Sequence, residues 1–229
     1  MKPNLSTTTL IIVDCLDLKR AIRVLEHCKG QCDFAEVKLL TSLETDYEHA
    51  VKITPINSLI HYSVFCLKEL YKYVDTKHML VVQHDGWIIN PQSWNPEWEQ
   101  YDYMGPLFNQ YDVMGVGGFS FRSRALMKSV SDKYPPFDNT DEQAHVLQSG
   151  MGFYEDGEIA MRWRSQLESE GFKFAPFHEA AQFAQGGNPN NNYHFPFPFG
   201  FHGSWRAVTL ETGFVHPNVK HDGINPQLV

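Results

Sequence analysis

Asp85 stands directly behind a short apolar run, Met79–Val82, and directly before Gly86. In an open α/β sheet, ligands bind outside the carboxyl ends of the strands, so an aspartate at such an end is well placed to meet one. Carboxylate oxygens suit Mg²⁺ and Mn²⁺, which often share them with substrate phosphates, and the glycine would let backbone pass close to the ligand. The same residues also suit an ordinary Asp-Gly turn, and the tripeptide does not separate the two interpretations.

A second acidic pair, Glu155 and Asp156, opens a sequence with helical periodicity, residues 154–172. Carboxylates in the first turn of a helix interact favourably with its dipole, which would keep Asp156 ionised. An ionised carboxylate is also what a general base requires. Spacing alone favours the structural interpretation, and neighbouring helix residues point in different directions, so only one of the pair can face a bound molecule.

Two glycine-containing stretches add further candidates. Gly117 and Gly118 precede Ser120, Arg122 and Arg124, which suits either a close approach of backbone to a ligand or a bulged strand before a helix. His202 lies between glycines and follows an asparagine- and glycine-rich segment, residues 186–201. A lone histidine is usually structural or exposed, but we expect this segment to be mobile and to bring His202 to the site when it closes.

Composition narrows the class of protein. The 229 residues suit one large domain or two small ones, and 42% apolar with 20% charged residues is ordinary for a soluble globular chain. The net charge of −8 argues against a nucleic acid or an anionic membrane as the main partner. The apolar stretch near the N-terminus is too short for a signal peptide or a membrane span, so we expect a cytoplasmic protein.

Four cysteines lie in the first third of the chain, which is too sparse for a secreted disulfide framework. Cys28 and Cys32 have a spacing that could begin a zinc site, but no second pair follows them. We therefore expect reduced thiols, some of them in the core.

Hydrophobic periodicity predicts alternating strands and helices in the first 86 residues. The expected elements are a strand over 7–14, a helix from 18 to 28, a strand over 34–42, a helix over 56–74 and a strand over 79–82. This order is typical of a parallel sheet with right-handed crossovers, as in a nucleotide-binding half. The first turn contains no glycine-rich phosphate loop.

The later chain is less regular. Prolines and aromatic residues after Gly86 indicate short irregular pieces, and residues 116–130 predict a short strand followed by a helix. Residues 131–153 have the composition of a surface loop. Four aromatic side chains could stack on sugar rings or equally belong to the core: Trp87, Trp94, Tyr101 and Tyr103.

In their order, these motifs resemble the GT-A-fold, nucleotide-sugar-dependent glycosyltransferases. More narrowly, the chain resembles a little-characterised bacterial family assigned as glycosyltransferases, over residues 8 to 205. The shared motifs are Gln83–Gly86, Asn90-Pro91 with Trp94, Tyr101–Tyr103 with Gly105, Gly117–Ser123, Glu155-Asp156 and Phe199–Gly203.

The resemblance implies roles for individual residues. Asp85 matches the last aspartate of the D-x-D motif, which binds a divalent metal, Mn²⁺ or Mg²⁺; Gln83 replaces the first aspartate. His202 matches a C-terminal histidine of the metal site, and Asp156 matches the base of inverting enzymes. The expected donor-binding residues are Asp14, Thr41, Ser42, His84, Asp85, Gly117 and Gly118. The expected acceptor-binding residues are Trp87, Tyr103 and Glu155.

We therefore expect an α/β, GT-A-like protein in which a Rossmann-like mixed sheet is flanked by helices. It would form a single domain over 1–229, with a nucleotide-binding half (7–86), an acceptor-binding and catalytic half (87–205) and a C-terminal tail (206–229). The expected activity is transfer of a sugar from a nucleotide-diphosphate sugar to a saccharide acceptor in cell-surface polysaccharide synthesis. A nucleotidyltransferase and a non-catalytic carbohydrate-binding module are the alternatives, and a nucleotidyltransferase would usually have a glycine-rich, basic N-terminal loop.

Overall fold

The computed structural model describes residues 1–108, 113–134, 154–186 and 197–203. The predicted loop over 131–153 and the predicted mobile segment over 186–201 lie mostly outside these ranges, and the tail over 206–229 lies wholly outside them. The strands are β1 (Asn4–Val13), β2 (Asp33–Thr41), β3 (Ala50–Lys52), β4 (His78–Val82), β5 (Gly86–Ile88), β6 (Tyr103–Met104), β7 (Leu107–Phe108), β8 (Val113–Met114), β9 (Phe119–Ser123), β10 (Ala184–Gly186) and β11 (Gly200–His202).

The helices in the described ranges include three longer α-helices and several short ones. The α-helices are α1 (Leu18–Gln31), α2 (Leu59–Lys68), α3 (Arg124–Lys133), α5 (Glu155–Gly157), α6 (Arg164–Ser169) and α7 (Phe177–Phe183). The 3-10 helices are η1 (Leu70–Tyr73), η2 (Pro91–Ser93) and η3 (Pro96–Gln100), and η4 (Glu158–Arg162) is a π-helix.

Local sequence explains where the three longest helices begin. Asp17 accepts a hydrogen bond from the backbone N–H of Arg20 at 3.1 Å, Ser58 accepts one from His61 at 3.2 Å, and Ser123 accepts one from Leu126 at 3.0 Å. Aspartate and serine are among the best residues for this position, because the side-chain oxygen satisfies a backbone N–H that has no partner within the helix. Helices α1, α2 and α3 are thus each defined by a cap that is visible in the sequence.

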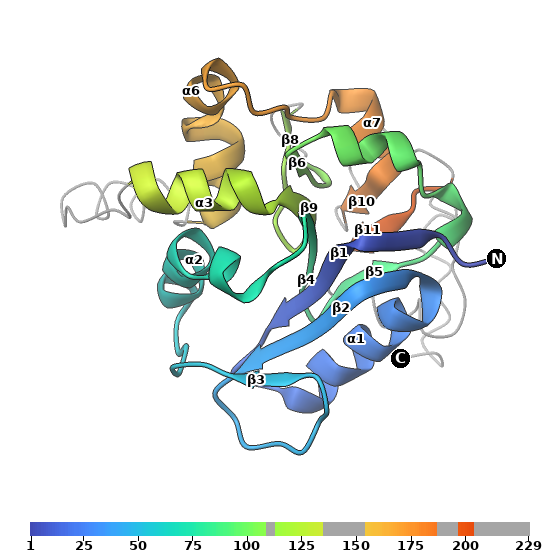
Figure 1. Cartoon of the computed structure of the whole chain (residues 1–229), viewed down its shortest axis with the longest axis vertical. Coiled ribbons are helices and arrows are strands. Elements are labelled where there is room, and N and C mark those ends of the chain that lie inside the picture. The colour runs from blue at the N-terminus through green and yellow to red at the C-terminus, as the bar shows by residue number, and fades with distance from the viewer. Residues whose placement is uncertain (109–112, 135–153, 187–196, 204–229) are drawn as a thin grey trace, which may run out of the picture.

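A six-stranded sheet forms the centre of the molecule, in the order β3-β2-β1-β4-β9-β6 (Figure 1). The strands β3, β2, β1 and β4 run parallel to one another. Strand β9 pairs antiparallel with β4, and the edge strand β6 pairs antiparallel with β9. The predicted α/β class, with a mixed sheet flanked by helices, is confirmed. The strand-helix-strand order predicted for the first half is also confirmed.

The strand order reverses its direction at β1, because β2 and β3 lie on one side of this strand and β4 lies on the other. Since parallel crossovers are right-handed, such a reversal places the connecting helices α1 and α2 on opposite faces of the sheet and opens a crevice between the carboxyl ends of β1 and β4. In Figure 1, α1 lies partly behind β2, whereas α2 lies at the left, below α3. The topology therefore provides a binding crevice between β1 and β4.

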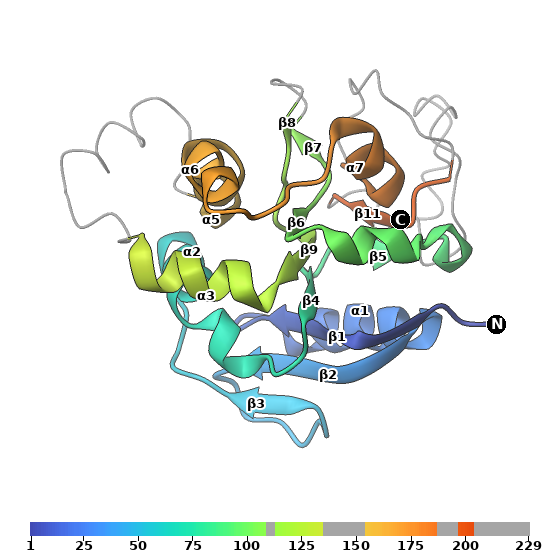
Figure 2. The ribbon, with the colours of Figure 1, turned by 45° about the horizontal axis from the view of Figure 1, so that its top comes forward.

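A second, three-stranded sheet in the order β10-β11-β5 was not predicted. Figure 2 shows β5 and β11 side by side, although more than a hundred residues separate them in the sequence. They pair antiparallel, with His202 opposite Gly86 and Phe201 opposite Trp87. This pairing fixes the end of the described chain against the segment that follows β4.

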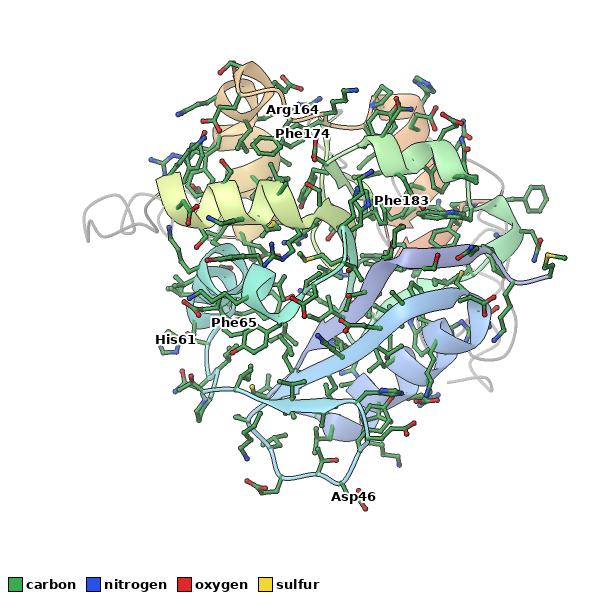
Figure 3. The ribbon with its side chains drawn as sticks, viewed as in Figure 1. Asp46, His61, Phe65, Arg164, Phe174 and Phe183 are labelled. Atoms are coloured by element: carbon green, nitrogen blue, oxygen red, sulfur yellow. The ribbon has the colours of Figure 1, made fainter. Side chains whose placement is uncertain are left out.

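The helix predicted over 154–172 is interrupted. Its first turn is α5, which runs into the π-helix η4, and a regular α-helix resumes only as α6. The Arg164 guanidinium of α6 lies over the Phe174 ring, 5.1 Å from its centroid (Figure 3). This contact holds α6 against the segment that leads to α7.

Aromatic side chains join the two sheets. Phe199, just before β11, lies within 6.2 Å (ring centroids) of four other aromatic rings: Trp94, Trp98, Phe119 and Phe183. Trp98 also donates a hydrogen bond to the Glu179 carboxylate of α7 at 2.6 Å. The position of β11, and with it His202, therefore depends on a packed aromatic core rather than on backbone pairing alone.

Other expectations concern the cysteines and the membrane. Cys28, Cys32 and Cys66 are buried, as expected for thiols of the core, and burial raises the pKa of the Cys28 thiol to about 12. None of the helices in the described part of the chain combines the length and the apolar character needed to span a bilayer.

We predict that Phe199→Ala lowers the free energy of unfolding by about 3–5 kcal/mol, because Phe199 is 0% exposed and its removal leaves a cavity between the sheets. Phe197→Ala is the matched control, since Phe197 is two residues away and 57% exposed; its effect should be about 0.5 kcal/mol or less. Urea denaturation followed by tryptophan fluorescence measures both. Equal losses in the two variants would show that β11 does not depend on the aromatic core.

Candidate functional site

A pocket opens at the crevice between β1 and β4. Its volume is about 280 Å³, and its walls come from the end of β1, the loop before α1, the first turn of α2 and the residues after β4. The lining residues are Val13, Asp14, Cys15, Leu16, Ile56, Asn57, Ser58, Leu59, Tyr62, Gln83 and His84. The pocket thus lies where a doubly wound sheet binds its ligands.

Two of the predicted donor-binding residues, Asp14 and His84, line this pocket. The Oδ1 atom of Asp14 accepts hydrogen bonds from the backbone N–H groups of Leu16 at 2.7 Å and Asp17 at 2.9 Å. Asp14 therefore shapes the loop between β1 and α1 at the same time as it borders the pocket.

Two other predicted donor-binding residues, Thr41 and Ser42, do not line the pocket. Thr41 is buried, and its hydroxyl accepts a hydrogen bond from the backbone N–H of Leu43 at 3.1 Å. Because β2 lies one strand away from the crevice, its end does not reach the pocket between β1 and β4. Thr41 is thus the last residue of β2, and its hydroxyl binds the backbone that follows the strand.

The predicted metal-binding residues Asp85 and His202 lie together. The Nε2 atom of His202 is 3.3 Å from Oδ1 of Asp85, and the backbone N–H of Gly203 donates to the Asp85 carbonyl oxygen at 3.1 Å. The pairing of β11 with β5 already places His202 there, so no closing movement is needed to bring it to Asp85.

The electrostatics of Asp85 suit a cation. Burial by itself would raise the pKa of its carboxyl, but the His202 contact and the charges of His202 and His84 outweigh burial and hold the pKa below its usual value. The 3.3 Å contact is close enough for attraction, yet it lacks the direction of a hydrogen bond, and Oδ1 has no hydrogen-bond partner among the described residues. A buried carboxylate oxygen without a donor is costly to keep unless something else binds it.

Asp85 and His202 fit a divalent cation as a pair of ligands. Within the described ranges, no group of three or more histidine, cysteine, aspartate or glutamate side chains is arranged to hold a metal ion. Mg²⁺ is commonly held by one or two side chains while phosphate oxygens and water complete its shell. The donor set therefore suits a metal that arrives with a phosphorylated ligand.

Gly86 and Gly118 let these parts approach one another. A Cβ atom on Gly118 would lie 2.0 Å from Nε2 of His202, and one on Gly86 would lie 2.6 Å from the backbone oxygen of Gly118. The space beside each glycine is thus filled by protein. Internal packing thus explains why Gly86 and Gly118 carry no side chain, and a donor-binding role of Gly117 and Gly118 stays a prediction.

Asp156 lies at the other side of the same glycine pair. Its Oδ2 atom accepts a hydrogen bond from the Gly117 N–H at 2.6 Å, and its Oδ1 atom accepts one from the Gly157 N–H at 2.7 Å. Burial, and then the neighbouring Glu155 charge, raise the pKa of the Asp156 carboxyl to about 6. The two backbone N–H donors lower the pKa, as expected near a helix start, but burial and the Glu155 charge outweigh them.

The predicted acceptor-binding residues are core residues instead. Tyr103 is fully buried and donates a hydrogen bond to the Gly115 carbonyl oxygen at 2.8 Å. Trp87 is 4% exposed and packs edge-on against His27. Glu155 is 3% exposed and forms an ion pair with Arg122 at 3.0 Å. Core packing thus accounts for all three positions, and their contact with an acceptor stays a prediction.

Sequence reasoning missed three residues of the pocket wall, and it named Arg122 without indicating that this side chain is buried. Asn57, Ser58 and Tyr62 line the pocket from the start of α2, and the serine cap before an apolar helix was the available signal for them. Arg122 is fully buried behind Gly117. No sequence signal indicates that Arg122 is buried, because strand alternation does not reveal a partner 33 residues away.

The family model described as "Protein of unknown function (DUF5672)" matches residues 48–202, which is more than half of the chain. The chain belongs to the DUF5672 family. The DUF5672 match includes Asp85, Gly117-Gly118, Asp156 and His202. A comparison with curated proteins finds no match.

Solved structures similar to this DUF5672 chain include two glycosyl- or mannosyltransferases and one bifunctional protein. A glycosyltransferase involved in glycosylation of the major capsid of PBCV-1 is 11% identical, with a TM-score of 0.48, over 87% of this chain and 95% of that one. The bifunctional IspDF of Campylobacter jejuni is 10% identical, with a TM-score of 0.42, over 62% of this chain and 47% of that one, so the match spans about half of IspDF. The mannosyltransferase PcManGT of Pyrobaculum calidifontis, in complex with GDP-Man and Mn²⁺, is 13% identical, with a TM-score of 0.40, over 79% and 70%.

We predict that Gly118→Ala lowers the free energy of unfolding by about 1–3 kcal/mol, because the new methyl group overlaps the His202 ring. Gly30→Ala is the matched control: nothing lies within 4 Å of its Cβ position in α1, so the same change should stabilise the protein by about 0.5–1 kcal/mol. Denaturant titration gives both values. Equal stability of the two variants would mean that His202 does not rest on Gly118.

Proposed function

We propose that this DUF5672 protein is a GT-A-like glycosyltransferase that moves a sugar from a nucleotide-diphosphate donor to a saccharide acceptor with inversion. The supporting observation is one arrangement. The Asp85–His202 pair and the Asp156 carboxylate flank the Gly117-Gly118 backbone, next to a pocket between β1 and β4. In this arrangement the pocket would hold the donor, the Asp85–His202 pair would face the leaving diphosphate, and Asp156 would be the base.

The donor would bind with its nucleoside in the pocket, so that residues 7–86 form the nucleotide-binding half. Apolar walls from Val13 and Ile56 suit a flat base, and Asn57, Gln83 and His84 offer polar groups. His84 is next to Asp85 in the sequence, so a diphosphate leaving the pocket would pass directly to the Asp85–His202 pair.

A divalent cation, Mn²⁺ or Mg²⁺, would be held by Asp85 and His202, the residues that fit it. When bound, such an ion neutralises charge on a departing diphosphate. The protein itself contributes the position of the two ligands: β4 ends at Asp85, and the β5–β11 pairing holds His202 beside it. Gln83, in place of the first aspartate of D-x-D, donates a hydrogen bond to Tyr62 at 3.1 Å and so belongs to the pocket wall.

Asp156 would act as the general base. With a pKa of about 6, its carboxyl is mostly ionised at pH 7 yet still basic enough to take a proton from an acceptor hydroxyl. Inversion requires one such base and no covalent intermediate, so a single carboxylate suffices. The proton passes from the hydroxyl to Asp156 as the oxygen attacks the anomeric carbon and the diphosphate leaves.

Two features disfavour the alternatives. The loop between β1 and α1 carries the carboxylates Asp14 and Asp17 and no glycine, whereas a nucleotidyltransferase would usually have a glycine-rich, basic loop there. A carbohydrate-binding module would use exposed aromatic rings, but Trp87 and Tyr103 are buried. A saccharide acceptor in cell-surface polysaccharide synthesis rests on the family resemblance of the sequence, and a cytoplasmic location rests on the shortness of the apolar stretch near the N-terminus.

We predict that Asp156→Asn lowers the transfer rate by about 10²-fold or more while donor affinity stays nearly unchanged, because the amide keeps the shape and loses the basicity. In the parent, kcat/KM should fall about tenfold per pH unit below pH 6, since the protonated carboxyl cannot accept a proton. Release of nucleoside diphosphate in the presence of acceptor measures both effects. Asp75→Asn, at an exposed aspartate, is the control. Full activity of Asp156→Asn together with loss of activity in Glu155→Gln would show that the base is Glu155 and not Asp156.

We predict that Asp85→Ala abolishes the Mn²⁺-dependent part of nucleoside-diphosphate affinity, because one of the two side-chain ligands is removed. Asp46→Ala, at an exposed aspartate on the loop between β2 and β3 (Figure 3), should keep that dependence. Calorimetry with and without Mn²⁺ measures it. If Asp85→Ala binds as the parent does with metal present, Asp85 is a turn residue and the metal hypothesis fails.

A further inference from the structure

Arg122 is a fully buried cation in β9, the strand between β4 and the edge strand β6. Its Nη2 atom donates to Oε1 of Glu155 at 3.0 Å, and its guanidinium lies 5.4 Å from the centroid of the Tyr103 ring. Its Nη1 atom has no hydrogen-bond partner among the described residues. Because a buried ion pair is a poor source of stability compared with apolar residues of the same volume, stability alone does not account for Arg122.

A chain of hydrogen bonds leads from Arg122 to Gly117. The Nε atom of Arg122 donates to Oγ of Ser120 at 2.8 Å, and this hydroxyl in turn donates to the Gly117 carbonyl oxygen at 2.8 Å. Nη2 of Arg122 is also within 3.3 Å of the same carbonyl oxygen. The guanidinium fork therefore holds Gly117 directly and through Ser120.

Gly117 connects Arg122 and Ser120 to Asp156. Its N–H donates to Oδ2 of Asp156 at 2.6 Å, so the residue is held on its carbonyl side by Arg122 and Ser120 and holds the carboxylate on its amide side. Arg122 also binds Glu155, the residue before Asp156 in the sequence. Two independent routes from one guanidinium thus end at the same carboxylate.

We propose that Arg122 is a positioning residue that, through Ser120 and Gly117, sets the place of the Asp156 carboxylate relative to the Asp85–His202 pair. The glycine pair links the two ends, since Gly117 binds Asp156 and Gly118 packs against His202. This proposal rests on the proposed function, in which Asp156 is the base. Arg122 itself does not touch a substrate, because it has no exposed surface.

The charged and titratable groups around Asp156 determine in which direction the pKa of its carboxyl should change. Glu155 contributes a negative charge, and Arg122 contributes a positive one that opposes it. Tyr62 and Cys66 of α2 and Tyr103 of β6 also lie near, but burial raises the pKa of each, so they stay neutral at pH 7. Loosening the Gly117 N–H from Asp156 should therefore raise the pKa of the Asp156 carboxyl further.

The test uses Ser120→Ala, which removes one hydroxyl from the chain and leaves every charge in place. The Asp156 carboxyl is titrated by ¹³C NMR, and its signal is assigned by its loss in Asp156→Asn. We expect its pKa to move upward from about 6 and kcat to fall about tenfold at unchanged donor KM, since a misplaced base affects the chemical step. Arg122→Lys keeps the charge but lacks the fork, and it should change both quantities in the same direction.

Ser123→Ala is the matched control, because it removes a buried hydroxyl from the same strand without touching Gly117. Ser123 caps α3 and donates to Asp102 at 2.6 Å, so its loss lowers stability but should leave the Asp156 titration and kcat unchanged. If Ser120→Ala titrates as the parent does, or if Ser123→Ala shifts the titration equally, the positioning role is overturned. If the parent transfers no sugar, the proposed function fails, and the titration still decides whether Arg122 positions Asp156.

Discussion

The antiparallel pairing of β9 with β4 is the constraint on which the site depends. Val82, the last residue of β4, is opposite Phe119, the first residue of β9. Gly117 and Gly118 therefore lie beside the residues that follow β4, and the Gln83 N–H donates to the Gly118 carbonyl oxygen at 2.8 Å. A parallel neighbour would begin at the opposite end of β4, so a sheet parallel throughout would not place this turn at the crevice.

The two glycines leave the backbone without side chains at the point where three segments meet. His202 approaches from one side, and Glu155 and Asp156 approach from the other. Each segment has its own support: the aromatic cluster holds the chain before His202, and the Arg122–Glu155 ion pair holds the chain before Asp156. The segments that carry His202 and Asp156 are thus each anchored by buried contacts.

A buried charge is the cost of this arrangement. Taking Arg122 and Glu155 out of water is unfavourable, and their attraction, together with the hydrogen bonds from Arg122 to Ser120 and Gly117, offsets part of that penalty while Nη1 keeps no partner among the described residues. The same negative charge on Glu155 helps to raise the pKa of Asp156. The buried Arg122–Glu155 pair, which is unfavourable for folding, thus also shifts the pKa of the neighbouring Asp156 carboxyl. Shifted pKa values of this kind are common at functional sites.

Much of the fold could be predicted from the sequence, because the signals were local. The caps at Asp17, Ser58 and Ser123 and the apolar periodicity define the longest helices and the parallel strands. The end of β4 identified Asp85 as a candidate, and the acidic pair identified Asp156. These features depend on residues within a few positions of one another, where intrinsic preference and hydrogen bonding to the nearest backbone decide the outcome.

Tertiary structure alone decided which side chains are exposed and which segments meet. Trp87, Tyr103 and Glu155 have the composition of a binding surface but are buried, because partners far along the chain cover them. The second sheet, the interrupted helix after Glu155 and the contact between His202 and Asp85 likewise require the pairing of β5 with β11 and the packing of the aromatic core. Burial and strand pairing are properties of contacts between distant residues, so no local pattern encodes them.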